Sequence, residues 1–363
     1  MSHATRKNIG VIGLGIIGRG VAGNLRRKGF PVYVWNRSPR SVPNFVGSPG
    51  EVTEICNYIQ IFVSDDDALL QTVEQLSGKL TPRHIVVAHS TVAPDSMRAA
   101  AEIVDRRKAQ FVEAPFTGSK AAAENGELVY YVSGKDAALR EARPILQASS
   151  KEIIEIGPTI GHASAIKIAT NMITAASVQA TAEALAVVQV LGLPMEKFVE
   201  AMRSNASHST TLAMKLTKML NRDFEPHFSV KHMVKDMQIA NQIGLSNYLD
   251  LGVTAAARDQ LLEQMHWGHG DDDYSVVARK YLHEPAPVAG DELQLEEEPE
   301  QADADVPVAG SIERETQSKQ DVTLDVPPAP LVDVASGAAG KEATRLRRGF
   351  LKQLLSRLSS GQE

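Results

Sequence analysis

The 363-residue chain is poor in cysteine and in aromatic side chains, with a single cysteine, Cys56, and 5% Phe, Trp and Tyr. One cysteine excludes a disulfide within the chain and a Cys-x-x-Cys zinc site. The opening MSHATRKN lacks the ordered basic, apolar and small-residue regions of a signal peptide. We therefore expect a reducing, cytoplasmic location and no bound metal.

Charge of one sign and long apolar runs are also scarce. The formal net charge is −6, which argues against general binding to nucleic acid. No charge-free run of about eighteen apolar residues suggests a membrane span. With 43% hydrophobic and 23% charged residues, the composition is typical of a soluble globular enzyme, and the length allows two or three domains.

The first part of the chain alternates between strand-like and helix-like segments. The apolar run NIGVIGLG, the helical stretch IIGRGVAGNLRRKG and the β-branched run FPVYVWNR make a βαβ unit of about thirty residues. Further strand-like runs are YIQIFVS, HIVVAHS, QFVEAP and ELVYYVSG. We predict that residues 1–162 form a Rossmann domain, a doubly wound α/β fold with a parallel sheet.

Residues 163–284 are predicted to form a second, all-helical domain. Breaks between helices are expected at Gly192 to Pro194, at Asn221 to Pro226 and at Gly244. The stretch IKIATNMITAASVQATAEALAVVQVL has no Pro or Gly and is apolar on all sides. Such a helix should be buried, as a spine between the domains or against a second subunit. We therefore also expect a homo-dimer or homo-tetramer.

The composition changes after Leu282. Residues 285–340 are acidic and rich in proline, which predicts a disordered linker. Residues 341–363 alternate leucine with lysine and arginine, which predicts a basic amphipathic helix. That helix could touch an anionic membrane surface, dock on an unknown partner or fold back on the chain, and the sequence leaves these alternatives open.

A glycine-rich turn follows the first predicted strand and precedes a predicted helix. It consists of Gly13, Leu14, Gly15, Ile16, Ile17 and Gly18. This G-x-G-x-x-G pattern provides a tight turn, close approach of a pyrophosphate to the backbone and close packing of helix on strand. The strand and helix around it favour dinucleotide binding over a mere tight turn.

The end of the second strand indicates which dinucleotide is bound. An NAD-binding fold usually has Asp or Glu there, about twenty residues past the glycines, to hold the ribose hydroxyls. This chain has Asn36, Arg37 and Ser38 instead. A guanidinium and a hydroxyl can bind a 2′-phosphate, so we predict NADP, with NAD possible; the alternative is that Arg37 is a solvated loop residue.

The segment GHASAIKIATN places Lys167 and Asn171 four residues apart where the chain turns helical after a glycine. Both side chains then share one helix face. Burial near an apolar helix lowers the pKa of a lysine and prepares it to donate a proton near neutral pH. Lys167 is thus a candidate general acid, although a lysine with a solvated head group is the commoner case.

Two further segments carry polar clusters. In FVEAPFTGSKAAAENGEL, the loop with Thr117, Gly118 and Ser119 offers hydroxyls and backbone N–H groups to a carboxylate, or equally caps a helix. In FSVKHMVKDM, a helix start places lysines four apart on one face and His232 near Asp236 on another. Either cluster alone has an ordinary structural explanation.

Together these four segments resemble the β-hydroxyacid dehydrogenase family, to which the 3-hydroxyisobutyrate dehydrogenases belong, over residues 8–282. The order of fingerprint, substrate loop, Lys with Asn four residues on, and late Lys-Asp pair is similar to that of the family. Within the family, the VWNR, APFTGSKAAAENGEL and FSVKHMVKDM segments look most like the glyoxylate and succinic semialdehyde reductases.

This resemblance implies a reductase that uses NADPH on small carboxylated aldehydes, or forms them from the hydroxy acids. It implies that Lys167 donates the proton and that Asn171 orients it. It assigns the substrate to Thr117, Gly118, Ser119, Phe228 and Asp236, and the cofactor also to Ser64, Thr91 and Lys235.

The chain departs from the family pattern at two places. Ala163 stands where a glycine usually precedes the lysine, which should alter the local turn, and Phe116-Thr117 replaces Val-Ser in the substrate loop. Three alternatives stay open: a 3-hydroxyisobutyrate-type dehydrogenase, a non-catalytic scaffold with the dehydrogenase fold, and an imine-reducing relative. The presence of Lys167 argues against the last two.

Overall fold

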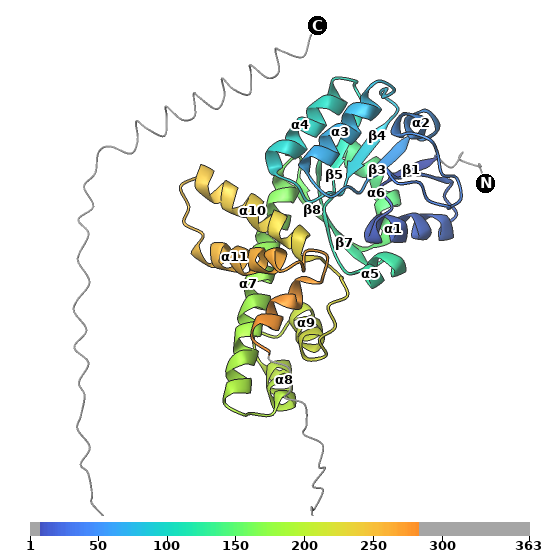
Figure 1. Ribbon diagram of the computed structural model, residues 1–363. Helices are drawn as coiled ribbons and strands as arrows, with labels where there is room; N and C mark the ends of the chain where they lie inside the picture. Colours follow the sequence, from blue (N-terminus) through green and yellow to red (C-terminus); the bar gives the residue numbers. More distant parts are fainter. Residues whose placement is uncertain (1–7, 283–363) are drawn as a thin grey trace, which may run out of the picture. The chain divides into compact units, whose positions relative to one another are not determined.

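The computed structural model describes residues 8–282, and Figure 1 gives their arrangement. The predicted linker at 285–340 and the predicted basic helix at 341–363 lie outside the described residues. The described part contains a sheet covered by helices, followed in sequence by a group of helices.

The sheet has a parallel core of five strands. In spatial order these are β2 (Val32–Trp35), β1 (Ile9–Ile12), β3 (Tyr58–Ile61), β4 (Ile85–Ala88) and β5 (Gln110–Glu113). The sheet continues with β7 (Leu128–Gly134), which pairs with β5, and then with β6 (Phe116–Thr117) and β8 (Ser150–Gly157), which both pair with β7. Every side chain of β1, β3 and β4 is buried, as expected for strands covered on both faces.

Helices cover both faces of this sheet. One face carries α1 (Ile16–Arg27), α5 (Lys120–Asn125), α6 (Asp136–Leu146) and the 3₁₀ turn η1 (Gln147–Ser149). The other carries α2 (Pro49–Ile55), α3 (Asp66–Ser77) and α4 (Pro94–Asp105). The two apolar clusters between the helices and the sheet are separate, which confirms the doubly wound α/β fold.

The prediction of an all-parallel sheet is wrong at one edge. β7 runs antiparallel to β5 and to β6. The chain between β5 and β7 forms β6 and the six-residue helix α5 instead of a full crossover helix, so it reverses direction. The strand β8 was not predicted, because its charged residues Lys151, Glu152 and Glu155 are exposed and its burial does not alternate along the strand.

The second part is all-helical, as predicted. It contains α7 (His162–Val190), α8 (Met195–Ser204), α9 (Thr210–Leu220), α10 (Val230–Ser246), α11 (Gly252–His266) and the 3₁₀ helix η2 (Tyr274–Lys280). α7 contacts α9, α10, α11 and η2 in this part and also α4, β7 and β8 of the sheet domain (Figure 1). It is therefore the spine that the sequence predicted.

The break predicted at Gly244 lies two residues before the actual end of α10 at Ser246, and another break was missed. Gly244 lies inside α10, where a Cβ would come within 2.7 Å of Leu251 Cδ1, so the glycine permits close packing of the following chain. The missed break lies between α8 and α9, where Ser209 begins α9 by accepting a hydrogen bond from the Leu212 N–H at 3.1 Å.

By length and composition alone, α7 could cross a membrane. It contacts several helices and the sheet, and ten of its 29 residues are buried. One part of its surface is nevertheless apolar and exposed, with Ile173 70% and Val190 84% accessible. The homo-oligomer remains a prediction.

Candidate active site

A cavity of about 440 Å³ lies between the sheet domain and the helical part. One wall is the fingerprint turn with the residues that follow β3 and β4; the other is residues 226–229 with the first turns of α10. β1 pairs with β2 on one side and β3 on the other, so the cavity lies beyond the carboxyl ends of parallel strands at the point where strand order reverses. Ligands bind at this place in open α/β sheets.

The three fingerprint glycines have different neighbours. A Cβ at Gly13 would lie 1.9 Å from the Phe62 carbonyl oxygen, and one at Gly18 would lie 2.0 Å from the Gly13 carbonyl oxygen. A Cβ at Gly15 would meet no described atom within 4 Å, and Gly15 lines the cavity. Helix α1 begins at Ile16, where no described side chain caps the first N–H groups. Close packing explains why Gly13 and Gly18 are glycines. The open space at Gly15 and the uncapped N-terminus of α1 suit a bound pyrophosphate.

The residues after β2 divide into one structural side chain and two exposed ones. Asn36 Oδ1 accepts a hydrogen bond from the Leu14 N–H at 2.9 Å, and Asn36 Nδ2 donates to the Ser38 carbonyl oxygen at 2.8 Å. Asn36 therefore holds the fingerprint turn against β2. Arg37 and Ser38 are exposed, so their side chains are accessible to a ligand phosphate.

Ser64 and Thr91, both predicted to contact the cofactor, line the cavity. Ser64 Oγ donates a hydrogen bond to Asp65 Oδ2 at 2.5 Å, which is the main cause of the lowered pKa of Asp65. The Thr91 carbonyl oxygen accepts a hydrogen bond from Lys235 Nζ. This bond joins the end of β4 to α10 across the cavity.

Lys167 lies in the second turn of α7 and is half-buried. Its Nζ donates a hydrogen bond to Asn171 Oδ1 at 2.9 Å, so the four-residue spacing brings the two side chains together as predicted. Burial lowers the pKa of Lys167 to about 8; the Asp236 carboxylate opposes this shift and Lys235 adds to it. An amine with this pKa can exchange a proton near neutral pH.

Asp236 connects this pair to the cavity. Its buried carboxylate accepts from Asn171 Nδ2 at 2.6 Å on one oxygen and from Lys235 Nζ at 2.6 Å on the other. Lys235 and Asp236 line the cavity, whereas Lys167 and Asn171 join it through the Asp236 carboxylate. Thr91, which follows β4, and residues of α7 and α10 thus form one hydrogen-bonded network.

The predicted substrate loop is only partly at the cavity. Gly118, at a φ of 141°, lines it, while Thr117 is exposed in β6 and is absent from the lining. Ser119 Oγ accepts from the Ala122 N–H at 3.2 Å and so caps α5, which is the structural role that the sequence left open. The bulky Phe116, one of the two departures from the family pattern, forms part of the cavity wall.

Phe228 lines the opposite wall together with basic side chains. Its ring centroid lies 5.8 Å from that of His232 in a stacked arrangement. Lys231 and Lys235 also line the cavity from α10. Burial lowers the pKa of His232, and the two lysines lower it further, so the imidazole is neutral at neutral pH. Each lysine is paired with a carboxylate that also lines the cavity, Lys231 with Asp271 and Lys235 with Asp236, so this wall carries charges of both signs.

Glu113 is a site residue that the sequence did not single out. Its side chain is fully buried at the end of β5, and its oxygens accept from the N–H groups of Gly161, at 2.6 Å, and Ser164, at 2.5 Å. Burial raises its pKa, although these N–H donors oppose the shift. Glu113 therefore caps α7 one turn before Lys167.

The backbone conformation explains why an alanine is accommodated at position 163. The left-handed residue is Gly161, with a φ of 94°, whereas Ala163 is already in α7 and is fully buried. The backbone therefore does not require a glycine at position 163.

His89 is a second residue that the sequence analysis missed. It lines the cavity and stacks on Phe62 with 4.2 Å between ring centroids. Its Nδ1 lies 2.8 Å from the Ala114 carbonyl oxygen, and burial lowers its pKa to about 3. It therefore adds a neutral ring to the cavity. Within residues 8–282, no group of His, Cys, Asp and Glu side chains is arranged to hold a metal ion.

Two family models match the chain in succession. Residues 8–157 match the NAD binding domain of 6-phosphogluconate dehydrogenase, and residues 161–281 match the NAD-binding domain of NADP-dependent 3-hydroxyisobutyrate dehydrogenase. With the fold and the order of the site residues, these matches place the chain in the β-hydroxyacid dehydrogenase family. They also confirm a nicotinamide dinucleotide as the expected cofactor, in agreement with the free space at Gly15.

Among curated relatives, the chain is similar to the cytokine-like nuclear factor N-PAC of Danio rerio, with 29% identity over 77% of this chain and 63% of that protein. The match thus spans less than two thirds of N-PAC's length. It is equally similar to glyoxylate/succinic semialdehyde reductase 1 of Arabidopsis thaliana, with 29% identity over 74% of this chain and 96% of that protein.

A solved structure supports the fold. The 3-hydroxyisobutyrate dehydrogenase of Salmonella typhimurium superposes with a TM-score of 0.70 at 21% identity, over 76% of this chain and 100% of that one. At this identity the likeness concerns the arrangement of helices and strands.

Proposed function

We propose that this protein is an NADPH-dependent reductase that converts small carboxylated aldehydes, such as glyoxylate and succinic semialdehyde, into hydroxy acids. The observation that carries the proposal is the network of Lys167, Asn171, Asp236 and Lys235, which borders the same cavity as the fingerprint turn. The similarity to the Arabidopsis reductase over nearly its whole length supports the substrate class.

In this proposal each part of the cavity has one task. The fingerprint turn and the start of α1 bind the pyrophosphate, and Arg37 with Ser38 binds the 2′-phosphate. When bound, NADPH supplies the hydride for the carbonyl carbon. Lys231 and the backbone at Gly118 hold the substrate carboxylate, while Phe228 and Phe116 exclude water.

The proton comes from Lys167. Its amine turns from Asn171 toward the cavity, which the four-carbon stem of lysine permits, and protonates the carbonyl oxygen. Asn171 stays anchored to Asp236 by the 2.6 Å hydrogen bond and so fixes the starting position of the amine. Lys235 holds Asp236 and the end of β4 in place.

Arg37 should set the preference for NADPH. The Arg37→Ala variant is expected to raise KM for NADPH about tenfold and to leave KM for NADH unchanged, since only the former carries the 2′-phosphate. Arg40→Ala, which removes another exposed arginine three residues on, is the matched control. Steady-state rates with each cofactor measure this; a wild-type preference for NADH would refute the role given to Arg37.

The reaction should depend on pH through Lys167. Because the acid must be protonated, kcat for reduction is expected to be level below the lysine's pKa of about 8 and to fall about tenfold per pH unit above it. Oxidation of the hydroxy acid needs the neutral amine and should show the opposite dependence. Profiles of kcat against pH in both directions test this, and two profiles with the same slope would contradict it.

Two other functions have specific support. The second family model favours a 3-hydroxyisobutyrate-type dehydrogenase, which would oxidise the branched hydroxy acid faster than it reduces glyoxylate. The similarity to N-PAC, whose name is that of a nuclear factor, is compatible with a non-catalytic dehydrogenase-fold scaffold, which would bind the dinucleotide without turnover. Initial rates with glyoxylate, succinic semialdehyde and 3-hydroxyisobutyrate, each with the NADP and the NAD form of the cofactor, distinguish the three proposals. The cytoplasmic location remains a prediction.

A further inference from the structure

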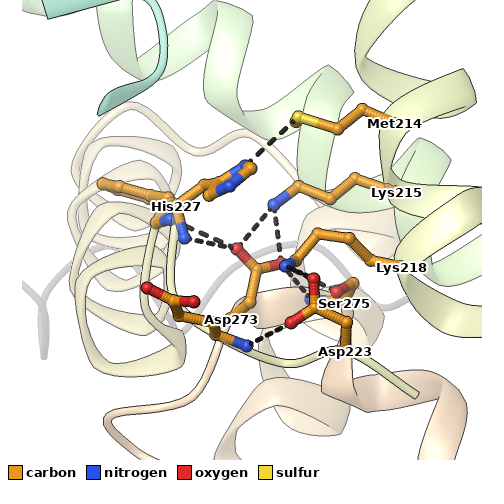
Figure 2. Close-up of polar contacts among 9 residues, drawn as sticks. Met214, Lys215, Lys218, Asp223, His227, Asp273 and Ser275 are labelled. Carbon is orange, nitrogen blue, oxygen red and sulfur yellow. Dashed lines mark hydrogen bonds and ion pairs between the residues drawn. The ribbon is translucent and has the colours of Figure 1, made fainter. Parts of the chain in front are cut away.

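The helical part contains a buried ion pair that the proposed mechanism does not use. Lys215 of α9 and Asp273, just before η2, are 1% and 0% exposed. Lys215 Nζ lies 2.6 Å and 2.8 Å from the two carboxylate oxygens of Asp273, as the dashed lines of Figure 2 mark. The side chain of Lys215 also places its charge 4.1 Å from the centre of the Tyr274 ring.

The Asp273 carboxylate accepts four other hydrogen bonds. One oxygen accepts from the N–H groups of His227, at 3.0 Å, and Phe228, at 3.3 Å. The other accepts from the N–H and the Oγ of Ser275, at 3.1 Å and 2.7 Å. One buried carboxylate thus fixes two separate stretches of backbone.

The first of these stretches, residues 226–229, is part of the cavity wall. The Tyr274 N–H donates a further hydrogen bond to the Phe228 carbonyl oxygen, at 3.0 Å, and the Asp273 N–H donates to the carbonyl oxygen of Phe224, just before this stretch, at 2.8 Å. The Phe228 ring meets the Tyr274 ring edge-on, with 6.1 Å between centroids. The place of Phe228 in the wall therefore depends on where Asp273 is held.

A buried ion pair is weak evidence for stability, because removing two charges from water costs about as much as their attraction returns. An apolar pair of the same size would fill the space. Such an apolar pair would provide no acceptor for the backbone N–H groups of His227 and Phe228. Asp273 without Lys215 would be a buried charge with no opposite charge beside it. The contacts of this pair thus match a task in positioning better than one in filling the core.

We propose that the Lys215–Asp273 pair is a positioning device for the substrate wall: Lys215 holds the Asp273 carboxylate, which holds the backbone of His227 and Phe228. The pair touches neither substrate nor cofactor, and it determines how tightly the aldehyde is bound. The effect on substrate rests on the proposed reductase function, whereas the effect on the backbone does not.

The charge states agree with this arrangement. Burial acts to raise the pKa of Asp273, but Lys215 and Ser275 outweigh it and the pKa is lowered, so the carboxylate is ionised at neutral pH. Burial lowers the pKa of Lys215, and Asp273 opposes that shift. Figure 2 also shows a neighbouring pair, Lys218 with Asp223 at 2.8 Å, whose carboxylate binds the Glu225 N–H and neither N–H of the wall.

The test compares Lys215→Met with Lys218→Met as the matched control. In Lys215→Met the segment 224–231 should lose protection against amide hydrogen exchange while α7 keeps it. KM for the aldehyde should rise about tenfold with kcat changed less than about threefold, and the pH profile of kcat should not move. Lys218→Met should leave exchange of the wall and KM as in the wild type.

A double variant, Lys215→Met with Asp273→Asn, separates positioning from loss of a charge. It keeps a carbonyl oxygen for the two N–H groups without an unpaired charge, so protection of the segment and KM should return to within about threefold of the wild type. If Lys215→Met alone does not fold, the double variant still allows hydrogen exchange and KM to be measured without the ion pair. Unchanged exchange in Lys215→Met, equal effects in Lys218→Met, or a folded double variant without protection would each overturn the proposal. If the wild type reduces no aldehyde, the reductase proposal fails. The amide hydrogen exchange of segment 224–231 then still decides whether the Lys215–Asp273 pair positions the wall.

Discussion

Replacing Lys167 by methionine is expected to lower kcat for aldehyde reduction roughly 100- to 10,000-fold, the range that a general acid contributes. Methionine keeps the length of the side chain and suits a helix, so α7 should remain intact. KM for NADPH should stay within about threefold, because the fingerprint turn, Arg37 and Ser38 are unaffected. Steady-state kinetics and a titration of NADPH binding measure the two effects separately.

The control for this variant is Lys197→Met, which removes an exposed lysine from α8. It should leave kcat unchanged. The pH dependence assigned to the pKa near 8 should disappear in Lys167→Met and persist in the control. Turnover of Lys167→Met at the wild-type rate would mean that another group supplies the proton.

Removing the Glu113 carboxylate is expected to have the largest effect on stability. Glu113→Ala leaves the N–H groups of Gly161 and Ser164 buried without their acceptor, and it opens a space at the end of β5. We expect a loss of roughly 2–5 kcal/mol in the free energy of unfolding. Glu113→Gln, which keeps one acceptor oxygen, should lose less than the alanine variant.

Chemical denaturation with each variant measures this effect. Glu152→Ala removes an exposed glutamate of β8 and should change the free energy of unfolding by less than about 0.5 kcal/mol. Because Glu113 fixes the start of α7 one turn before Lys167, the folded fraction of Glu113→Gln should also show a lower kcat. A Glu113→Ala variant as stable as the control would contradict the cap.

The parts of the site that the sequence predicted are those in which neighbouring residues act together. The turn from Gly13 to Gly18 is recognisable from six consecutive residues, and the pair of Lys167 and Asn171 depends only on the pitch of one helix. The adjacent residues Lys235 and Asp236 lie at the start of α10 as predicted. In each case the pattern and its structural consequence lie within a few residues of one another.

The parts that escaped prediction depend on residues distant in sequence. Glu113 caps a helix 48 residues away, and Lys215 meets Asp273 across 58 residues. Nothing in the strand QFVEAP distinguishes its glutamate from a solvated one. The cofactor contact of Asn36 remains a prediction, whereas the hydrogen bond that its amide oxygen accepts from the Leu14 N–H, 22 residues earlier, was not foreseen. Sequence spacing gives no measure of such contacts, because the fold alone brings the partners together.

The fold shows the same division. The parallel strands β1 to β5 were predicted because strand-like and helix-like segments alternate along the sequence. The direction of β7 depends on the fold of the residues between β5 and β7. They form β6 and the short helix α5 instead of a crossover helix, and this is decided by tertiary contacts. The exposed edge strand β8 has too few buried side chains to give a periodic signal.

The proposed reaction, reduction of carboxylated aldehydes by NADPH in the cavity beside Lys167, can be measured in one assay. It compares the initial rate of NADPH oxidation by the full chain, with glyoxylate and with succinic semialdehyde, to the rate with Lys167→Met. We expect saturable turnover by the wild type, with NADPH preferred over NADH, and its loss in the variant. Tight NADPH binding by the wild type with no turnover of either aldehyde would contradict the reductase function.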